Sequence, residues 1–144
     1  MARTNMIFLT FIMLILAACK NTATPKSAVE VVGQKISVSD GLYTDVSVAE
    51  LQTMLANKDF TFVNVHIPFE GNIASTDLSI PYDEIGQYLG KLPADKNAKI
   101  VLYCRSGRVS SIAAETLVSQ DYTNVWNLTG GMVAWEQAGL PMKR

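Results

Sequence analysis

The chain has 144 residues, which suits one domain, and 49% of its residues are hydrophobic. From residue 30 onward it carries nine Lys and Arg against 13 Asp and Glu, a formal net charge of −4. Because there is no basic stripe, charge gives no support to nucleic-acid binding, and no nucleic-acid partner is expected.

The N-terminus has the pattern of an export signal. A positive charge at Arg3 precedes an apolar run over residues 6–16, and "LAAC" follows at 16–19. A membrane-spanning helix needs about 20 apolar residues, so this run is too short to be a permanent anchor. "LAAC" resembles the bacterial lipobox, which implies a lipoprotein signal peptide over residues 1–18 and a lipidated Cys19.

A polar segment without periodicity follows the cysteine and predicts a flexible tether over residues 19–35. Two or more acyl chains on Cys19 would hold the protein stably on a membrane surface without a spanning helix. The protein is therefore expected to be exported and lipid-anchored in the bacterial cell envelope. Lys20 directly after the cysteine, in place of aspartate, is similar to lipoproteins sorted to the outer membrane, which implies its periplasmic face if the host is Gram-negative.

From residue 36 to residue 144 the pattern is that of a folded domain. Ser47 and Glu50 form a capping box, and apolar residues at helical spacing predict a helix that ends near residue 57. β-branched and aromatic residues over 60–66 predict a strand. Residues 82–89 are expected to form a short helix.

The second half alternates strands with helices. Residues 99–103 and 125–128 predict two buried strands, each followed by a helix, at 109–117 and after the Gly130–Gly131 pair. This order predicts an α/β fold with a mainly parallel sheet that helices cover on both faces. Ligands bind such sheets beyond the carboxyl ends of the strands, where Cys104 lies.

The segment that begins at Cys104 can bind an anion. The backbone N–H groups of a helix N-terminus point into a short loop there, and we expect them, with Arg105 and Arg108, to keep Cys104 mainly as thiolate at neutral pH. Gly107 allows the loop to turn. On spacing alone a second interpretation stays open, in which Cys104 is a small buried hydrophobe and the loop a solvated turn.

"CRSGRVSSIAAETL" at 104–117 and "VWNLTGGMVAWEQAGLP" at 125–141 resemble the rhodanese family of sulfurtransferases, and the resemblance covers residues 43–142. It implies a single rhodanese-like domain in which Cys104 carries a persulfide. It also implies that the backbone amides around the added sulfur belong to the anion-binding loop: Arg105, Ser106, Gly107, Arg108 and Val109.

The same resemblance implies that Arg105 and Arg108 attract a small sulfur-containing anion such as thiosulfate, and that neither metal nor cofactor is needed. Related phosphatases carry an arginine six positions after the cysteine, where this chain has Ser110, so phosphatase activity is not expected. The first half departs from the family at Asn64-Val65-His66, where Asp-Val-Arg is usual. His66 is expected to be structural.

Two functions remain open. The first is a membrane-anchored sulfurtransferase that passes sulfur to a thiol or to a cyanide-like acceptor. The second is a low-turnover module that binds a partner or senses reactive sulfur. The intact cysteine favours the enzyme, whereas the lack of a second cysteine after Cys19 means that the acceptor must be external.

Overall fold

The computed structural model describes residues 29–144. The predicted signal peptide, Cys19 and the tether as far as residue 28 lie outside the described residues. Within the described part, no helix is long and apolar enough to cross a membrane.

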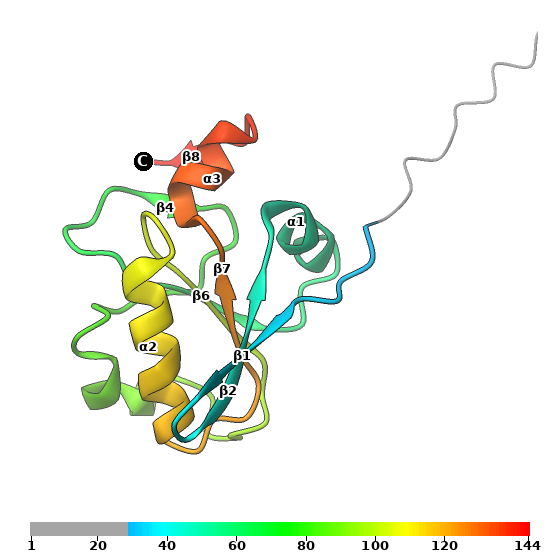
Figure 1. Cartoon of the computed structure of the whole chain (residues 1–144). Coiled ribbons are helices and arrows are strands. Elements are labelled where there is room, and N and C mark those ends of the chain that lie inside the picture. Colours follow the sequence, from blue (N-terminus) through cyan, green and yellow to red (C-terminus); the bar gives the residue numbers. More distant parts are fainter. Residues whose placement is uncertain (1–28) are drawn as a thin grey trace, which may run out of the picture.

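A six-stranded sheet forms the centre of the domain (Figure 1). Every neighbouring pair is parallel except the antiparallel hairpin of the first two strands, so the predicted mainly parallel sheet is confirmed. In spatial order the strands are β1 (Gln34–Val38), β2 (Gly41–Val46), β7 (Val125–Leu128), β6 (Ile100–Tyr103), β3 (Thr61–Asn64) and β5 (Leu78–Ser79).

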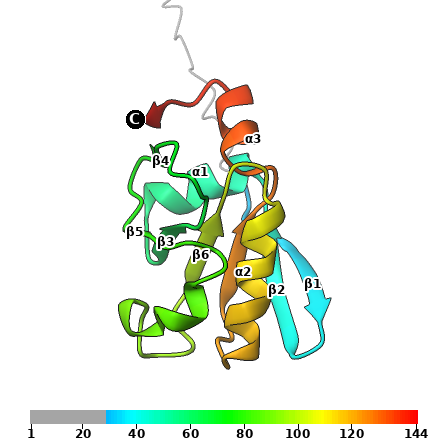
Figure 2. The same ribbon diagram turned by 90° about the vertical axis from the view of Figure 1, so that its left-hand side faces the viewer.

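Helices cover both faces of the sheet, as predicted. α2 (Arg108–Ser119) packs on one face, and α1 (Val48–Ala56) and α3 (Gly131–Gln137) pack on the other (Figures 1 and 2). All four residues of β6 are buried, because this strand lies between β7 and β3 and is covered from both sides. The two hydrophobic clusters thus meet at the strand that ends at Cys104.

The short helix predicted over 82–89 is divided and shifted in the structure. Two 3-10 helices lie there, η1 (Ile85–Gln87) and η2 (Leu89–Lys91), with hydrogen bonds between residues three apart. Gly86 and Gly90 weaken helix propensity, and the segment is too short to support an α-helix without strong formers. Ile85 still packs into the cluster under α2.

The ordered domain begins earlier than residue 36. β1 starts at Gln34 and pairs with β2, a hairpin that the sequence analysis does not predict. The N–H groups of Val32 and Gly33 donate to Oε1 of Glu50, at 3.1 and 2.9 Å. The last residues of the predicted tether are therefore bound to the first helix of the domain.

The capping box at the start of α1 is confirmed. The Ser47 side chain accepts a hydrogen bond from Glu50 N, and Oε2 of Glu50 accepts one from Ser47 N at 2.8 Å. Burial pushes the pKa of Glu50 upward, but the hydrogen bonds from Ser47, Gly33 and Val32 outweigh it and lower the pKa to about 2.

Glu50→Gln is expected to lower the free energy of unfolding by about 1–2 kcal/mol at pH 7, because the amide cannot accept at both oxygen positions. Since the folded pKa lies below the ordinary value of 4.5, this stability is present above pH 4.5 and is lost as pH falls towards 2. Urea unfolding between pH 2 and 7 measures the effect. The exposed Glu30→Gln is the control, and equal curves for both variants would contradict the prediction.

A second, two-stranded sheet was not predicted. β4 (Asn72–Ile73) pairs antiparallel with β8 (Met142–Lys143). This pairing brings the C-terminal residues next to the segment that follows β3, close to the cysteine loop (Figure 2).

Candidate active site

Cys104 lies at the carboxyl end of β6, and only 1% of its surface is exposed. Its Sγ accepts hydrogen bonds from Gly107 N at 3.1 Å and from the Ser110 hydroxyl at 3.3 Å. Gly107, with φ +87°, is the N-cap of α2, so the sulfur faces the start of that helix. The thiol therefore belongs to the core, and its sulfur also accepts two hydrogen bonds, which a small buried hydrophobe would not need.

The glycine pair after β7 supports the backbone of the cysteine loop. Met132 N donates to Cys104 O, and Val133 N donates to Arg105 O, both at 2.9 Å. A Cβ atom on Gly131 would overlap the Cys104 carbonyl oxygen, and the residue has φ +56°. The sequence analysis used this pair only as a turn, whereas its place in the fold is against the cysteine loop.

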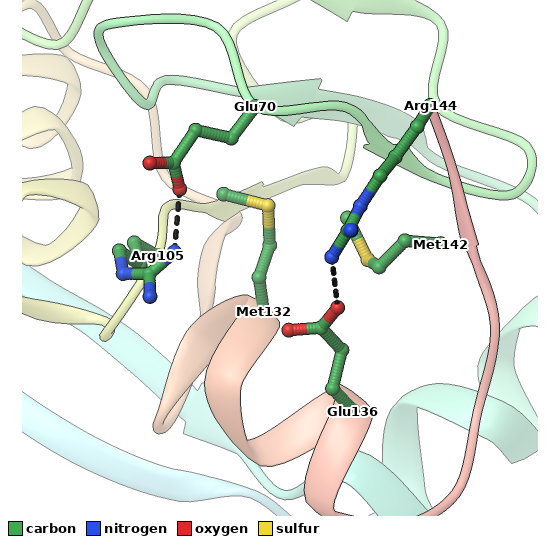
Figure 3. Close-up of a pocket in the computed structure, with 6 residues that line it drawn as sticks. All are labelled: Glu70, Arg105, Met132, Glu136, Met142 and Arg144. Atoms are coloured by element: carbon green, nitrogen blue, oxygen red, sulfur yellow. Dashed lines mark hydrogen bonds and ion pairs between the residues drawn. The ribbon is translucent and has the colours of Figure 1, made fainter.

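Arg105 is held by a carboxylate that the sequence analysis did not single out. Its NH1 lies 2.5 Å from Oε2 of Glu70, and His66 Nε2 lies 3.3 Å from the same oxygen (Figure 3 shows the Arg105–Glu70 pair). The hydrogen bond from Arg105 lowers the pKa of Glu70, against a smaller opposing effect of burial. Arg105 is thus part of an ion pair. His66, expected to be structural, lies one side chain away from it.

A cavity of about 370 Å³ adjoins this pair. Figure 3 shows two ion pairs on opposite sides of it, Glu70 with Arg105 and Glu136 with Arg144, and Met132 and Met142 among them. The second pair is 2.8 Å long. The two carboxylates and the two guanidinium groups that line the cavity balance in charge, so the cavity has no excess of positive charge to attract an anion.

Arg108 lines a different cavity, on the side of β2 and β7. Among residues 29–144 no carboxylate lies within 4.0 Å of its guanidinium. The two arginines of the loop therefore differ in charge environment, and Arg108 is the one whose charge is not neutralised by a neighbouring carboxylate.

The departures in the first half form a connected network. Asn64 Nδ2 donates to Gly71 O and to Asn72 Oδ1, both at 3.0 Å, and its Oδ1 accepts from His66 N at 2.9 Å. These bonds fix the turn that carries Glu70 towards Arg105. The signal for Glu70 in the sequence is only its position in this turn, because its partner is 35 residues away.

For the thiosulfate reaction that is proposed below, Glu70→Gln is expected to lower KM about twofold to fivefold at low salt, because it removes the negative charge beside Arg105. The effect should shrink as ionic strength rises. Initial rates against thiosulfate concentration at two salt concentrations measure it. Asp83→Asn, an exposed change of equal charge, is the control, and a KM that stays at the wild-type value in Glu70→Gln would contradict the prediction.

Within the part of the chain that the structure describes, no group of three His, Cys, Asp or Glu side chains could hold a metal ion.

Fold and site together define an α/β protein with a buried cysteine at the end of its central strand, whose sulfur accepts two hydrogen bonds from the start of the next helix. The model of the "Rhodanese-like domain" matches residues 47–138. The chain belongs to this family.

A relative from Allochromatium vinosum named "Sulfurtransferase" is 35% identical over 94 residues, which are 63% of this chain and 85% of that protein. The solved structure of a rhodanese-related protein from Thermoplasma volcanium has TM-score 0.58 and 31% identity, over 68% of this chain and 95% of that one. The structure of the human single-domain sulfurtransferase has TM-score 0.58 and 25% identity, over 65% of this chain and 95% of that one. The chain spans 30% of the length of some longer curated relatives.

Proposed function

We propose that this protein is a membrane-anchored sulfurtransferase that moves sulfane sulfur from a thiosulfate-like donor to a nucleophilic acceptor through a persulfide on Cys104. The observation that carries the proposal is the pair of hydrogen bonds to Sγ from Gly107 and Ser110 at the start of α2. Both donors are directed at the sulfur that would attack the donor, and the thiolate is the nucleophilic form of cysteine.

In the first half-reaction the Cys104 thiolate attacks the outer sulfur of thiosulfate. The sulfur–sulfur bond of the donor breaks, and sulfite leaves with the electron pair. In the second half-reaction cyanide or a thiolate attacks the outer sulfur of the persulfide, and the Cys104 thiolate is released as leaving group. Family membership supports the backbone amides of residues 105–109 as the groups that would surround the transferred sulfur.

The acceptor must come from outside the domain. Cys104 is the single free cysteine among residues 29–144, so no second thiol in this part of the chain can take the sulfur. Cyanide and small thiols both fit the second half-reaction. The reaction needs no metal or organic cofactor, because thiolate and persulfide alone carry the sulfur.

The anchor is a lipid on Cys19, and the location is the cell envelope. The support is the signal pattern of residues 1–19, and an export test can check it. Wild type should fractionate with membranes and incorporate a labelled fatty acid, and Cys19→Ser should do neither. Incorporation of the labelled fatty acid into Cys19→Ser would contradict the proposal that Cys19 carries the lipid.

A low-turnover module that binds a partner or senses sulfur is the alternative. It is favoured by the 1% exposure of Cys104 and by the neutralisation of Arg105 by Glu70, both of which hinder an anionic donor. A sensor would take up sulfur and release it slowly.

Intact mass spectrometry distinguishes the two functions. The domain from residue 27 onward should gain the mass of one sulfur atom from thiosulfate and lose it within seconds when cyanide is added. Uptake without rapid loss would favour the sensor. No uptake from thiosulfate or from polysulfide by fully reduced protein would overturn the sulfurtransferase.

A further inference from the structure

A second cavity, of about 310 Å³, lies on the other side of the cysteine loop from the Glu70–Arg105 pair. Its wall includes Tyr43 and Asp45 of β2, Asn127 of β7, and Arg108 and Ser111 of α2. The volume is at the small end of ligand cavities, which run from about 300 to 1,000 Å³. It suits a molecule of a few heavy atoms.

The side-chain oxygen of Asn127 is a hydrogen-bond acceptor that no donor reaches among the described residues. The residue is only 3% exposed, and its Nδ2 donates to Asp45 Oδ1 at 2.8 Å. Its Oδ1 has no hydrogen-bond partner in the part of the chain that the structure describes. A buried polar atom without a partner is destabilising, and because Oδ1 is itself covered from solvent, a ligand N–H group would bond to it after a small turn of the Asn127 side chain towards the cavity.

The cavity wall carries one negative side chain, Asp45, and one positive side chain, Arg108, which do not form an ion pair with each other. Among residues 29–144 no Lys, Arg or His side chain forms an ion pair with Asp45, and no carboxylate forms one with Arg108. Burial, then the negative charges of Asp45 and Glu115, raise the pKa of Tyr43, so two carboxylates act on this end of the cavity. A cation is favoured beside Asp45 and an anion beside Arg108.

We propose that this cavity binds a small zwitterion that carries a primary ammonium and a carboxylate, as a free amino acid does. The ammonium donates to Asp45 and to Oδ1 of Asn127. The carboxylate pairs with Arg108, whose planar guanidinium suits a carboxylate.

The site adjoins the sulfur without including it. Gly107 lines the cavity, and its N–H donates to Sγ of Cys104. An occupant would therefore contact the loop that holds the sulfur. Binding itself requires neither a persulfide nor turnover, so its failure is distinguishable from failure of the proposed transfer reaction.

L-serine is a suitable probe, because it is a zwitterion with no thiol that could react with a persulfide. Ethanolamine lacks its carboxylate and 3-hydroxypropionate lacks its ammonium. The full chain in detergent is titrated with each compound, and binding is followed by calorimetry and by the side-chain amide NMR signal of Asn127. L-serine should bind at least about tenfold more tightly than either single-charge analogue, since each lost charged hydrogen bond is worth about 1.5–3 kcal/mol.

Asp45→Asn should weaken L-serine binding at least about tenfold and remove its advantage over 3-hydroxypropionate. Asp40→Asn, which removes an equal charge outside this cavity, should bind as wild type does. Thermal unfolding shows whether each variant remains folded. An unchanged affinity in folded Asp45→Asn would overturn the proposal, and so would equal binding of the three probes. Absence of binding by wild type would also overturn it.

Discussion

Cys104→Ser is expected to reduce sulfur transfer more than about a thousandfold, because a neutral hydroxyl is a far weaker nucleophile than a thiolate and cannot form a persulfide. The fold should be kept. A serine hydroxyl can accept the same hydrogen bonds from Gly107 and Ser110 that Sγ accepts, and it is smaller than the thiol. Thiocyanate formation from thiosulfate and cyanide measures the loss, and intact mass measures sulfur uptake.

Cys19→Ser is the matched control, since it makes the same replacement at the chain's other cysteine. It should keep the wild-type rate and the wild-type gain of one sulfur. Thermal unfolding of Cys104→Ser should match wild type. Turnover in folded Cys104→Ser within tenfold of wild type would remove Cys104 from the mechanism.

Gly131→Ala is expected to lower the free energy of unfolding by about 3 kcal/mol or more. The new Cβ would overlap Cys104 O and lie 2.8 Å from the carbonyl group of Arg105, so the loop and α3 must separate. The hydrogen bonds from Met132 and Val133 to these carbonyls would be lost or stretched. Because the same carbonyls belong to the cysteine loop, the rate of sulfur transfer should fall as well.

Urea unfolding measures the stability, with Gly139→Ala as the control. Gly139 also has a positive φ, +76°, but a Cβ there would meet no atom within 4 Å. The control therefore carries only the strain of a left-handed alanine, about 1–2 kcal/mol. Equal losses in the two variants would show that conformational strain alone, and not the approach to the loop, accounts for the effect.

The elements predicted correctly are those with strong local patterns. The capping box of α1 is confirmed, because its two side chains are three residues apart and bond within one turn. The buried apolar run of β6 and the helix after the cysteine are likewise visible in short windows. The short helix predicted over 82–89 is two 3-10 helices over 85–87 and 89–91, since Gly86 and Gly90 leave too little local preference for one continuous helix.

The hairpin of β1 and β2 has a local signal that the sequence analysis did not use, Asp40-Gly41 between two short alternating runs. The pairing of β2 with β7, about 80 residues further along the chain, has no such local signal. Neither do β4 and β8, which are two residues long each and are paired with each other. Short strands gain most of their stability from the neighbour to which they bond, so a window of sequence does not contain it.

The sequence by itself determined the position of Cys104, the proposed nucleophile. A buried strand, a glycine turn and a helix follow one another directly, and this order alone brings Cys104 to a helix N-terminus, as Gly107 and the start of α2 confirm. Family membership followed from the same stretch and from the glycine pair.

Only the tertiary structure decided the surroundings of that nucleophile. It paired Arg105 with Glu70 and left Arg108 beside a separate cavity. It placed Gly131 against the cysteine loop, and it left Oδ1 of Asn127 without a partner among the described residues. The Arg105–Glu70 pair and the contact of Gly131 with the loop each join residues more than 15 positions apart, and the relative placement of such residues depends on how strands and helices pack, which no local pattern encodes.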